Sequence, residues 1–340
     1  MDKKKLMMTY PPLTAWQWQA NILSILWGRQ DTYDWLFSNY IIPICSIDDW
    51  SKGEKLFLDY IPHPFFDNCP WISCRVIDRE MIRKGWKNTR DFIIDNINKN
   101  TYVFTLVNIG RIVNDNRKYL HEICIFGYNQ NQNIVNIADF FDNKYAYKEF
   151  NFDTVCQAID DITPDEDYWD EYRGGIYLLK YIDNIGYEFI PQFVKNCFLL
   201  YISPQHMFSI IDMQSSRHKD NKISYGIDVC DKLVNQIERT IEKHFIWDQR
   251  AFHNYFDHKV MMVKRIEYMH ERNFLKNKLI SIEEFVWIRN ESAKLYNLCL
   301  KMNIKKVWDR DIANRMINTL HKIKEKEMKL YEEVAFNLSI

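Results

Sequence analysis

The segment HEICIFGYNQNQNIVNIADFF, residues 121–141, predicts two antiparallel β-strands joined by a short polar turn. His121 and Asp139 fall near the same end of this hairpin. Because strand side chains alternate between faces, the length of the turn decides whether the two share a face. A turn of three or five residues places Asp139 opposite Ile123, diagonal to His121 on one face. A turn of two or four residues separates them unless a β-bulge intervenes.

The chemistry of this hairpin has two interpretations. An edge histidine is most simply a solvated surface residue, whereas an imidazole beside a carboxylate is a catalytic pair if a nucleophile lies nearby. Asn131 tolerates the left-handed conformation that a three-residue turn needs. The two interpretations are distinguished by whether the rest of the chain supplies a nucleophile.

Composition restricts the class of protein. The chain has 340 residues, of which 47% are hydrophobic and 27% charged, so we expect a folded protein with a sizeable core. The net charge of −1, without a Lys/Arg stripe, argues against nucleic acid as a partner. The opening MDKKKLMMTYPP lacks the apolar stretch of a signal peptide, and no run approaches the length of a membrane span. We therefore expect a cytoplasmic protein with no membrane partner.

Cysteines, histidines and glycines give few site motifs. The eight cysteines are scattered without a CxxC pair, which predicts reduced, mostly buried thiols. No glycine-rich phosphate-binding motif is present, so no cofactor is expected. Four histidines lack the spacing that directs two imidazoles at one metal ion, so we expect no metal site and ordinary helix-surface or interdomain positions for His244, His253, His258 and His270.

Near the N-terminus the pattern predicts a helix over residues 14–26. Thr14 is the expected N-cap and Gln17 its capping-box partner. The face formed by Trp18, Ile22 and Leu26 is expected to pack on the sheet. Residues 30–86 give mixed signals, interpreted as short helices and loops.

Further along, periodicity predicts an α+β fold. Strands are expected over 102–113, in the hairpin at 121–141 and over 174–182. Helices are expected over 88–99 and 186–202, and a strand followed by a helix from Tyr147 to Ile159. From about residue 225 the pattern is helical, with four long amphipathic segments typical of a bundle. We predict an N-terminal domain with an antiparallel sheet at 1–165, a connecting strand and helix at 166–224 that complete its core, and a helical bundle at 225–340.

The span from Pro11 to about Ile162 resembles the N-terminal domain of the butirosin biosynthesis protein H family. These are papain-like, C39-peptidase-like cysteine enzymes of antibiotic and nonribosomal-peptide pathways. The resemblance rests on the first helix, the strand YVFTLVNIGRI, the pieces HEICIFGY and IVNIADFF, and the segment YKEFNFDTVCQAI. The stretch DQRAFHNYFDHKVMMVKRIEYM also resembles the helical tail of related proteins in peptide-assembly clusters.

This resemblance implies an acyl or aminoacyl transferase that forms an amide bond from a carrier-protein thioester and an amine. His121 would be the general base, and Asp139 would orient it and stabilise its imidazolium. The family's nucleophilic cysteine lies at the start of the first helix, where this chain has Trp18. An indole cannot attack an acyl carbon.

Other residues are poor candidates to replace parts of that machinery. Cys45, Cys69 and Cys74 precede His121 in the chain, but each is more simply a small buried thiol. Gln17 or its neighbour Gln19 is a candidate oxyanion-hole side chain, although the capping box already explains Gln17.

Three hypotheses remain. The chain is a thiol acyltransferase with a displaced nucleophile, or a direct-base catalyst in which His121 and Asp139 deprotonate the attacking amine. Alternatively, it is an inactive papain-like homologue that binds a carrier protein or pathway enzyme and acts as a scaffold.

Overall fold

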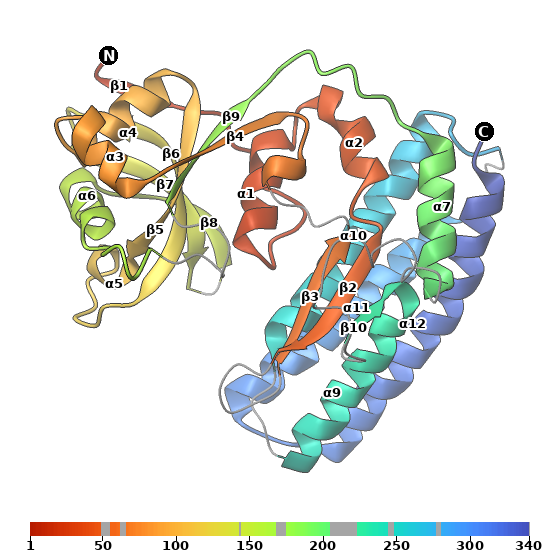
Figure 1. Cartoon of the computed structure of the whole chain (residues 1–340). Coiled ribbons are helices and arrows are strands. Elements are labelled where there is room, and N and C mark those ends of the chain that lie inside the picture. The colour runs from red at the N-terminus through yellow and green to blue at the C-terminus, as the bar shows by residue number, and fades with distance from the viewer. Residues whose placement is uncertain are drawn as a thin grey trace. The chain divides into compact units, whose positions relative to one another are not determined.

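The computed structural model describes residues 1–48, 55–61, 66–142, 144–167, 175–204, 223–243, 248–276 and 280–339 (Figure 1). The chain forms two compact units, each built from two separate segments. The first unit contains Met1–Thr32 and Phe65–Gly186, and the second contains Tyr33–Pro64 and Tyr187–Ile340. These units differ from the expected segments 1–165, 166–224 and 225–340. The strands at 42–48 and 55–61 belong to the unit of the C-terminal helices, and the strand at 176–181 belongs to the first unit.

The first unit is built on a seven-stranded antiparallel sheet, as expected for an α+β fold (Figure 1). The strands of this sheet, in spatial order, are β4 (Ile72–Ile77), β9 (Ile176–Tyr181), β5 (Thr101–Asn108), β6 (Leu120–Asn129), β7 (Ile134–Phe141) and β8 (Lys144–Asn151). The short strand β1 (Lys3–Lys5) pairs with β6 and lies outside this order.

Helices cover this sheet, and the central strand β5 is buried along its whole length. Asparagine caps start two of them: Asn88 accepts from the Asp91 amide before α4, and Asn151 accepts from the Thr154 amide before α6. The helical elements of this unit are α1 (Gln17–Leu26), η1 (Gln30–Thr32), η2 (Phe66–Asn68), α3 (Arg79–Gly85), α4 (Thr89–Asn98), α5 (Ile109–Ile112) and α6 (Phe152–Asp160).

A β-bulge in the β6–β7 hairpin determines that His121 and Asp139 share a face of the sheet. Asn129 pairs with Ile134, which leaves a four-residue turn at 130–133, with Asn133 rather than Asn131 in the left-handed region. That turn alone would place Asp139 on the wrong face. The register shifts between Ile125 and Gly127, so β6 carries one extra residue there. The bulge returns Asp139 to the face of His121.

Gly127, just after the bulge, has no room for a side chain. A Cβ at this position would lie 2.8 Å from the Asn136 Oδ1, 2.9 Å from the Lys4 carbonyl oxygen and 3.0 Å from the Lys5 Cα. We therefore expect Gly127→Ala to lower the free energy of unfolding by about 1–3 kcal/mol, because the backbone of β1 has to move. Urea denaturation measures this loss. Gly85→Ala, where no atom lies within 4 Å of the added Cβ, is the matched control.

The second unit combines a small antiparallel sheet with long helices (Figure 1). The four long C-terminal helices confirm the predicted bundle, whereas the strands β2 and β3 correct the expectation of short helices and loops over 30–86. The elements of this unit are α2 (Tyr33–Ser38), β2 (Ile42–Asp48), β3 (Lys55–Ile61), α7 (Pro191–Ile202), β10 (Ile223–Tyr225), η5 (Gly226–Asp228), α9 (Val229–Lys243), α10 (Gln249–Glu271), α11 (Ile282–Lys305) and α12 (Arg310–Asn337).

Candidate functional site

The candidate site lies where the start of α1 meets β6 and β7. The helix begins at Gln17 with Trp16 as its N-cap, and Trp16 provides no side-chain cap. The predicted start at Thr14 and the predicted capping box are therefore wrong. Gln17 is free to extend its side chain towards the sheet instead of back towards the helix start.

A polar stripe on α1 sets the orientation of the helix. Gln17, Asn21 and Ser24 lie at helical spacing and are all buried. The Tyr145 hydroxyl donates to the Asn21 Oδ1 over 2.7 Å and lies 3.0 Å from the Ser24 hydroxyl. Tyr147 adds a 2.9 Å hydrogen bond to the Ser24 hydroxyl. Because these bonds satisfy buried polar groups, they fix which side of α1 contacts the sheet.

Trp18 is not part of the buried face expected for it. It is the one residue of α1 outside the buried set, and its ring stacks on Trp16 with 5.0 Å between centroids. Consecutive helical residues point about 100° apart, so Gln17 and Trp18 leave the helix in different directions. The side chain that meets His121 from this helix is Gln17, one residue before the expected nucleophile position.

His121 and Asp139 form the expected pair. The His121 Nδ1 lies 3.1 Å from the Asp139 Oδ2. The carboxylate is fully buried, whereas 37% of the imidazole side chain is exposed. A buried carboxylate on Nδ1 holds the ring orientation and leaves its other edge towards solvent, which is the usual geometry of an oriented histidine.

Gln17 completes the cluster through its amide nitrogen. Its Nε2 donates to the Glu122 carbonyl oxygen over 2.9 Å and to the Asp139 Oδ1 over 3.0 Å. These two acceptors use both amide hydrogens and require nitrogen at this position. The same nitrogen lies 2.9 Å from Nδ1 and 3.1 Å from Nε2 of His121, so it sits against the ring and not along either lone pair. No amide hydrogen remains for a substrate oxyanion, the role considered for Gln17.

The pKa of His121 is raised above its ordinary value. Burial of the imidazole, the largest single influence, lowers this pKa, but the hydrogen bond and negative charge of Asp139, together with the contributions of Glu122, raise it by more. The pair therefore holds a proton more firmly than a free imidazole does.

This shift gives the first unit a defined pH dependence. Protonated His121 stabilises the folded state fully below about pH 6.5, the ordinary histidine pKa, and the contribution is lost as the pH rises through the raised pKa. We expect the wild type to exceed His121→Gln in free energy of unfolding by more at pH 6 than at pH 9. Urea denaturation at the two pH values tests this, and a difference that grows towards pH 9 contradicts it.

The cysteines proposed as displaced nucleophiles are poorly suited to that role. Cys45 and Cys69 are buried, and burial raises the pKa of each thiol to about 12. Cys74 lies on β4, three strands away from β6 and so about 14 Å from it at the usual strand spacing. Cys124 lies on β6 itself but is fully buried, and burial raises its pKa. A thiol with a raised pKa is a weak nucleophile at neutral pH.

Metal-binding geometry is not found among the described residues, where no three His, Cys, Asp or Glu side chains are grouped to hold an ion. Of the histidines expected on helix surfaces, His258 is fully buried, and His244 lies outside the described residues. None of the described helices has the length and apolar character needed to cross a membrane. Comparison with known proteins adds no relative: no protein-family model matches the chain, and no curated protein matches it.

Proposed function

We propose that the first unit is a papain-like domain in which Gln17 fills the place of the nucleophile. In such a domain the protein binds an acyl-carrying partner, and acts as a scaffold, without forming an acyl-enzyme. The observation that carries this proposal is the position of the Gln17 amide at the start of α1, against both His121 and Asp139. The partner expected from the family resemblance is an acyl- or peptidyl-carrier protein.

Covalent catalysis at this site requires a thiolate or alkoxide next to the imidazole. An amide nitrogen is not a nucleophile, and Gln17 uses both of its hydrogens on protein oxygens. The raised thiol pKa values of Cys45 and Cys69 argue against a substitute from elsewhere. His121 and Asp139 then act as hydrogen-bonding partners that hold α1 on the sheet.

Thiol labelling tests this proposal. We expect iodoacetamide at pH 7 to label the wild type and His121→Ala at the same slow rate, because no cysteine depends on the imidazole. Labelling of one cysteine in the wild type that is fast, stoichiometric and abolished in His121→Ala contradicts the proposal and supports a thiol acyltransferase.

Direct base catalysis is the second candidate function. The exposed part of the imidazole and the buried carboxylate behind it favour this alternative, since they form an oriented base that reaches solvent. His121 would take a proton from an amine acceptor while that amine attacks a bound thioester, again with no acyl-enzyme. Condensation of an amine with a carrier-bound thioester that is lost in His121→Ala, without thiol labelling, supports this function over a purely binding role.

A further inference from the structure

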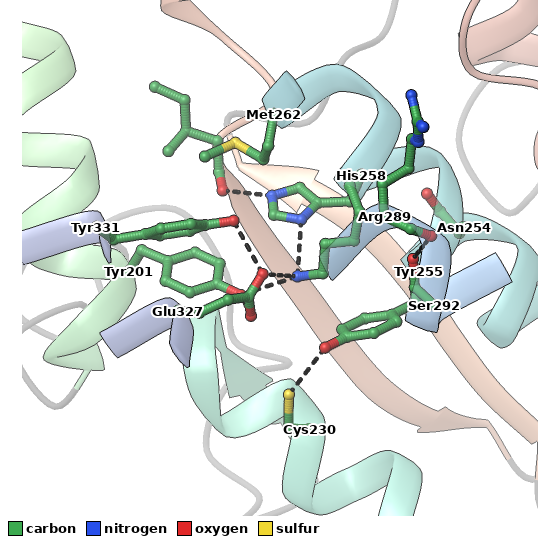
Figure 2. A network of polar contacts seen from close by, with 12 residues as sticks. Tyr201, Cys230, Asn254, Tyr255, His258, Met262, Arg289, Ser292, Glu327 and Tyr331 are labelled. Atoms are coloured by element: carbon green, nitrogen blue, oxygen red, sulfur yellow. Dashed lines mark hydrogen bonds and ion pairs between the residues drawn. The ribbon is translucent and has the colours of Figure 1, made fainter. Parts of the chain in front are cut away.

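A buried polar network lies in the second unit, where α7, α10 and α12 meet (Figure 2). Lys259 of α10 and Glu327 of α12 form an ion pair of 2.6 Å, and both side chains are fully buried. Tyr201 of α7 and Tyr331 of α12 donate to Glu327 over 2.8 and 2.9 Å. His258 is the member that joins this network to the strands.

His258 has both ring nitrogens in use. Its Nε2 donates to the Ile41 carbonyl oxygen, just before β2, over 2.9 Å. Its Nδ1 lies 3.1 Å from the Lys259 Nζ, which is a donor only, so Nδ1 is the acceptor. The ring is therefore neutral, with its proton on Nε2. It stacks with Tyr60 and Tyr201, at centroid distances of 5.9 and 5.7 Å.

A second proton has no place in this arrangement. It would have to bind Nδ1, where it faces the Lys259 ammonium. The three ammonium hydrogens already have three acceptors, in Glu327, Tyr201 and His258. A protonated ring would leave Lys259 one acceptor short and place two cations in contact inside the core.

We propose that His258 is an acid-sensing residue of the second unit, and that protonation of its Nδ1 dismantles the network that holds α7 and α12 to α10. The arrangement is a conformational switch: the network is complete with a neutral ring and incompatible with a charged one.

The charges around the ring also indicate that protonation of His258 destabilises the folded unit. Burial, followed by the charges of Lys259 and then Arg265, lowers the pKa of His258 well below its ordinary value, against the opposing hydrogen bond to Ile41. The Glu327 carboxylate pairs with Lys259, and the titratable side chains that stack on the ring are Tyr60 and Tyr201. None of these supplies an acceptor for a second ring proton.

The size of the effect follows from proton linkage. The unfolded chain binds a proton at this histidine below about pH 6.5 and the folded unit does not, so stability falls as the pH drops. For His258 this amounts to as much as ~16-fold in the unfolding equilibrium between pH 6.5 and pH 5, because the unfolded histidine is already half protonated at pH 6.5. His253, whose pKa burial lowers to about 4, adds an effect of the same sign. His121 in the first unit acts in the opposite direction, so each unit needs its own readout.

Nitrogen NMR of the wild type, labelled at its histidines, tests the switch without a variant. We expect the His258 ring to keep the neutral form with hydrogen on Nε2 as the pH falls, until the amide signals of α10 and α12 lose their folded positions together. A ring that becomes doubly protonated while those amide signals stay in place overturns the proposal. The proposal is also overturned if the second unit stays folded, with unchanged hydrogen-exchange protection of its amides, down to pH 4.5.

Hydrogen exchange on variants gives an independent measurement. After correction for intrinsic rates, the wild type is expected to lose up to ~16-fold more protection in α10 and α12 between pH 6.5 and pH 5 than His258→Gln. The control is His321→Gln, an exposed histidine of α12, which should follow the wild type. Equal pH dependence in all three proteins overturns the proposal, and the NMR result decides the matter if His258→Gln does not fold.

Discussion

Gln17→Cys is expected to create a reactive thiol that the wild type lacks. The new sulfur would replace the amide that now lies against His121, at the first residue of α1. The helix N-terminus and an adjacent imidazolium both favour thiolate, so the pKa of this cysteine should fall below that of an ordinary thiol. We expect iodoacetamide at pH 7 to label it at least ~10-fold faster than any native cysteine, since a pKa drop of one unit or more raises the thiolate fraction accordingly.

Trp18→Cys is the matched control for this prediction. It places the thiol at the position expected from the sequence, one residue further along the helix. We expect it to label slowly and without dependence on His121. Adding His121→Ala to Gln17→Cys should slow labelling of the new thiol. Fast, His121-dependent labelling of Trp18→Cys, with none for Gln17→Cys, would return the nucleophile position to residue 18.

Gln17→Leu is expected to destabilise the first unit strongly. The change removes the donor to the fully buried Asp139 carboxylate and to the Glu122 carbonyl oxygen, while keeping a side chain of similar volume. Loss of a donor from a buried acceptor costs about 1–3 kcal/mol, and loss at the partly buried Glu122 carbonyl oxygen adds about 1 kcal/mol, so we predict a decrease of about 2–4 kcal/mol in the free energy of unfolding. Chemical denaturation, with a signal assigned to the first unit, measures it.

The comparison variant for stability is Gln157→Leu, on the exposed side of α6 in the same unit. It should change the free energy of unfolding by no more than about 0.5 kcal/mol, as is usual for surface substitutions. If Gln17→Leu changes the free energy of unfolding as little as this control does, the Gln17 hydrogen bonds do not stabilise the cluster, and its contact with His121 does not contribute to stability.

The hairpin that carries His121 and Asp139 could be predicted from alternation alone, but its register could not. Strand side chains have a period of two, so one extra residue reverses every assignment beyond it. The bulge lies beside Gly127, where β1 comes close to β6. That contact joins residues more than a hundred positions apart. The sequence therefore allowed the pair as one of two outcomes, and alternation alone could not choose between them.

The start of α1 shows a different limit. Thr14 followed by Gln17 has the spacing of a capping box, and local propensity favours that start. The fold instead uses Gln17 to satisfy a buried carboxylate, which is worth more than a cap. The sequence signal that could have indicated this is the polar stripe of Gln17, Asn21 and Ser24 at helical spacing, since buried polar residues need partners across the interface.

The division into two units was also beyond a linear interpretation. β9 joins the first sheet from beyond residue 165, where the first domain was expected to end, and the β2–β3 pair belongs with helices that follow it by more than a hundred residues. Periodicity finds long helices well because each repeats its own pattern many times. It cannot assign a short strand containing Pro43 to a partner so far along the chain.

Mass spectrometry of the intact wild-type protein, after incubation with an acyl thioester of N-acetylcysteamine, tests the central claim most directly. With Gln17 in the nucleophile position we expect the mass of the unmodified chain at pH 7, while Gln17→Cys under the same conditions gains one acyl group. A stoichiometric acyl adduct on the wild type that maps to a cysteine and disappears in His121→Ala would contradict the account.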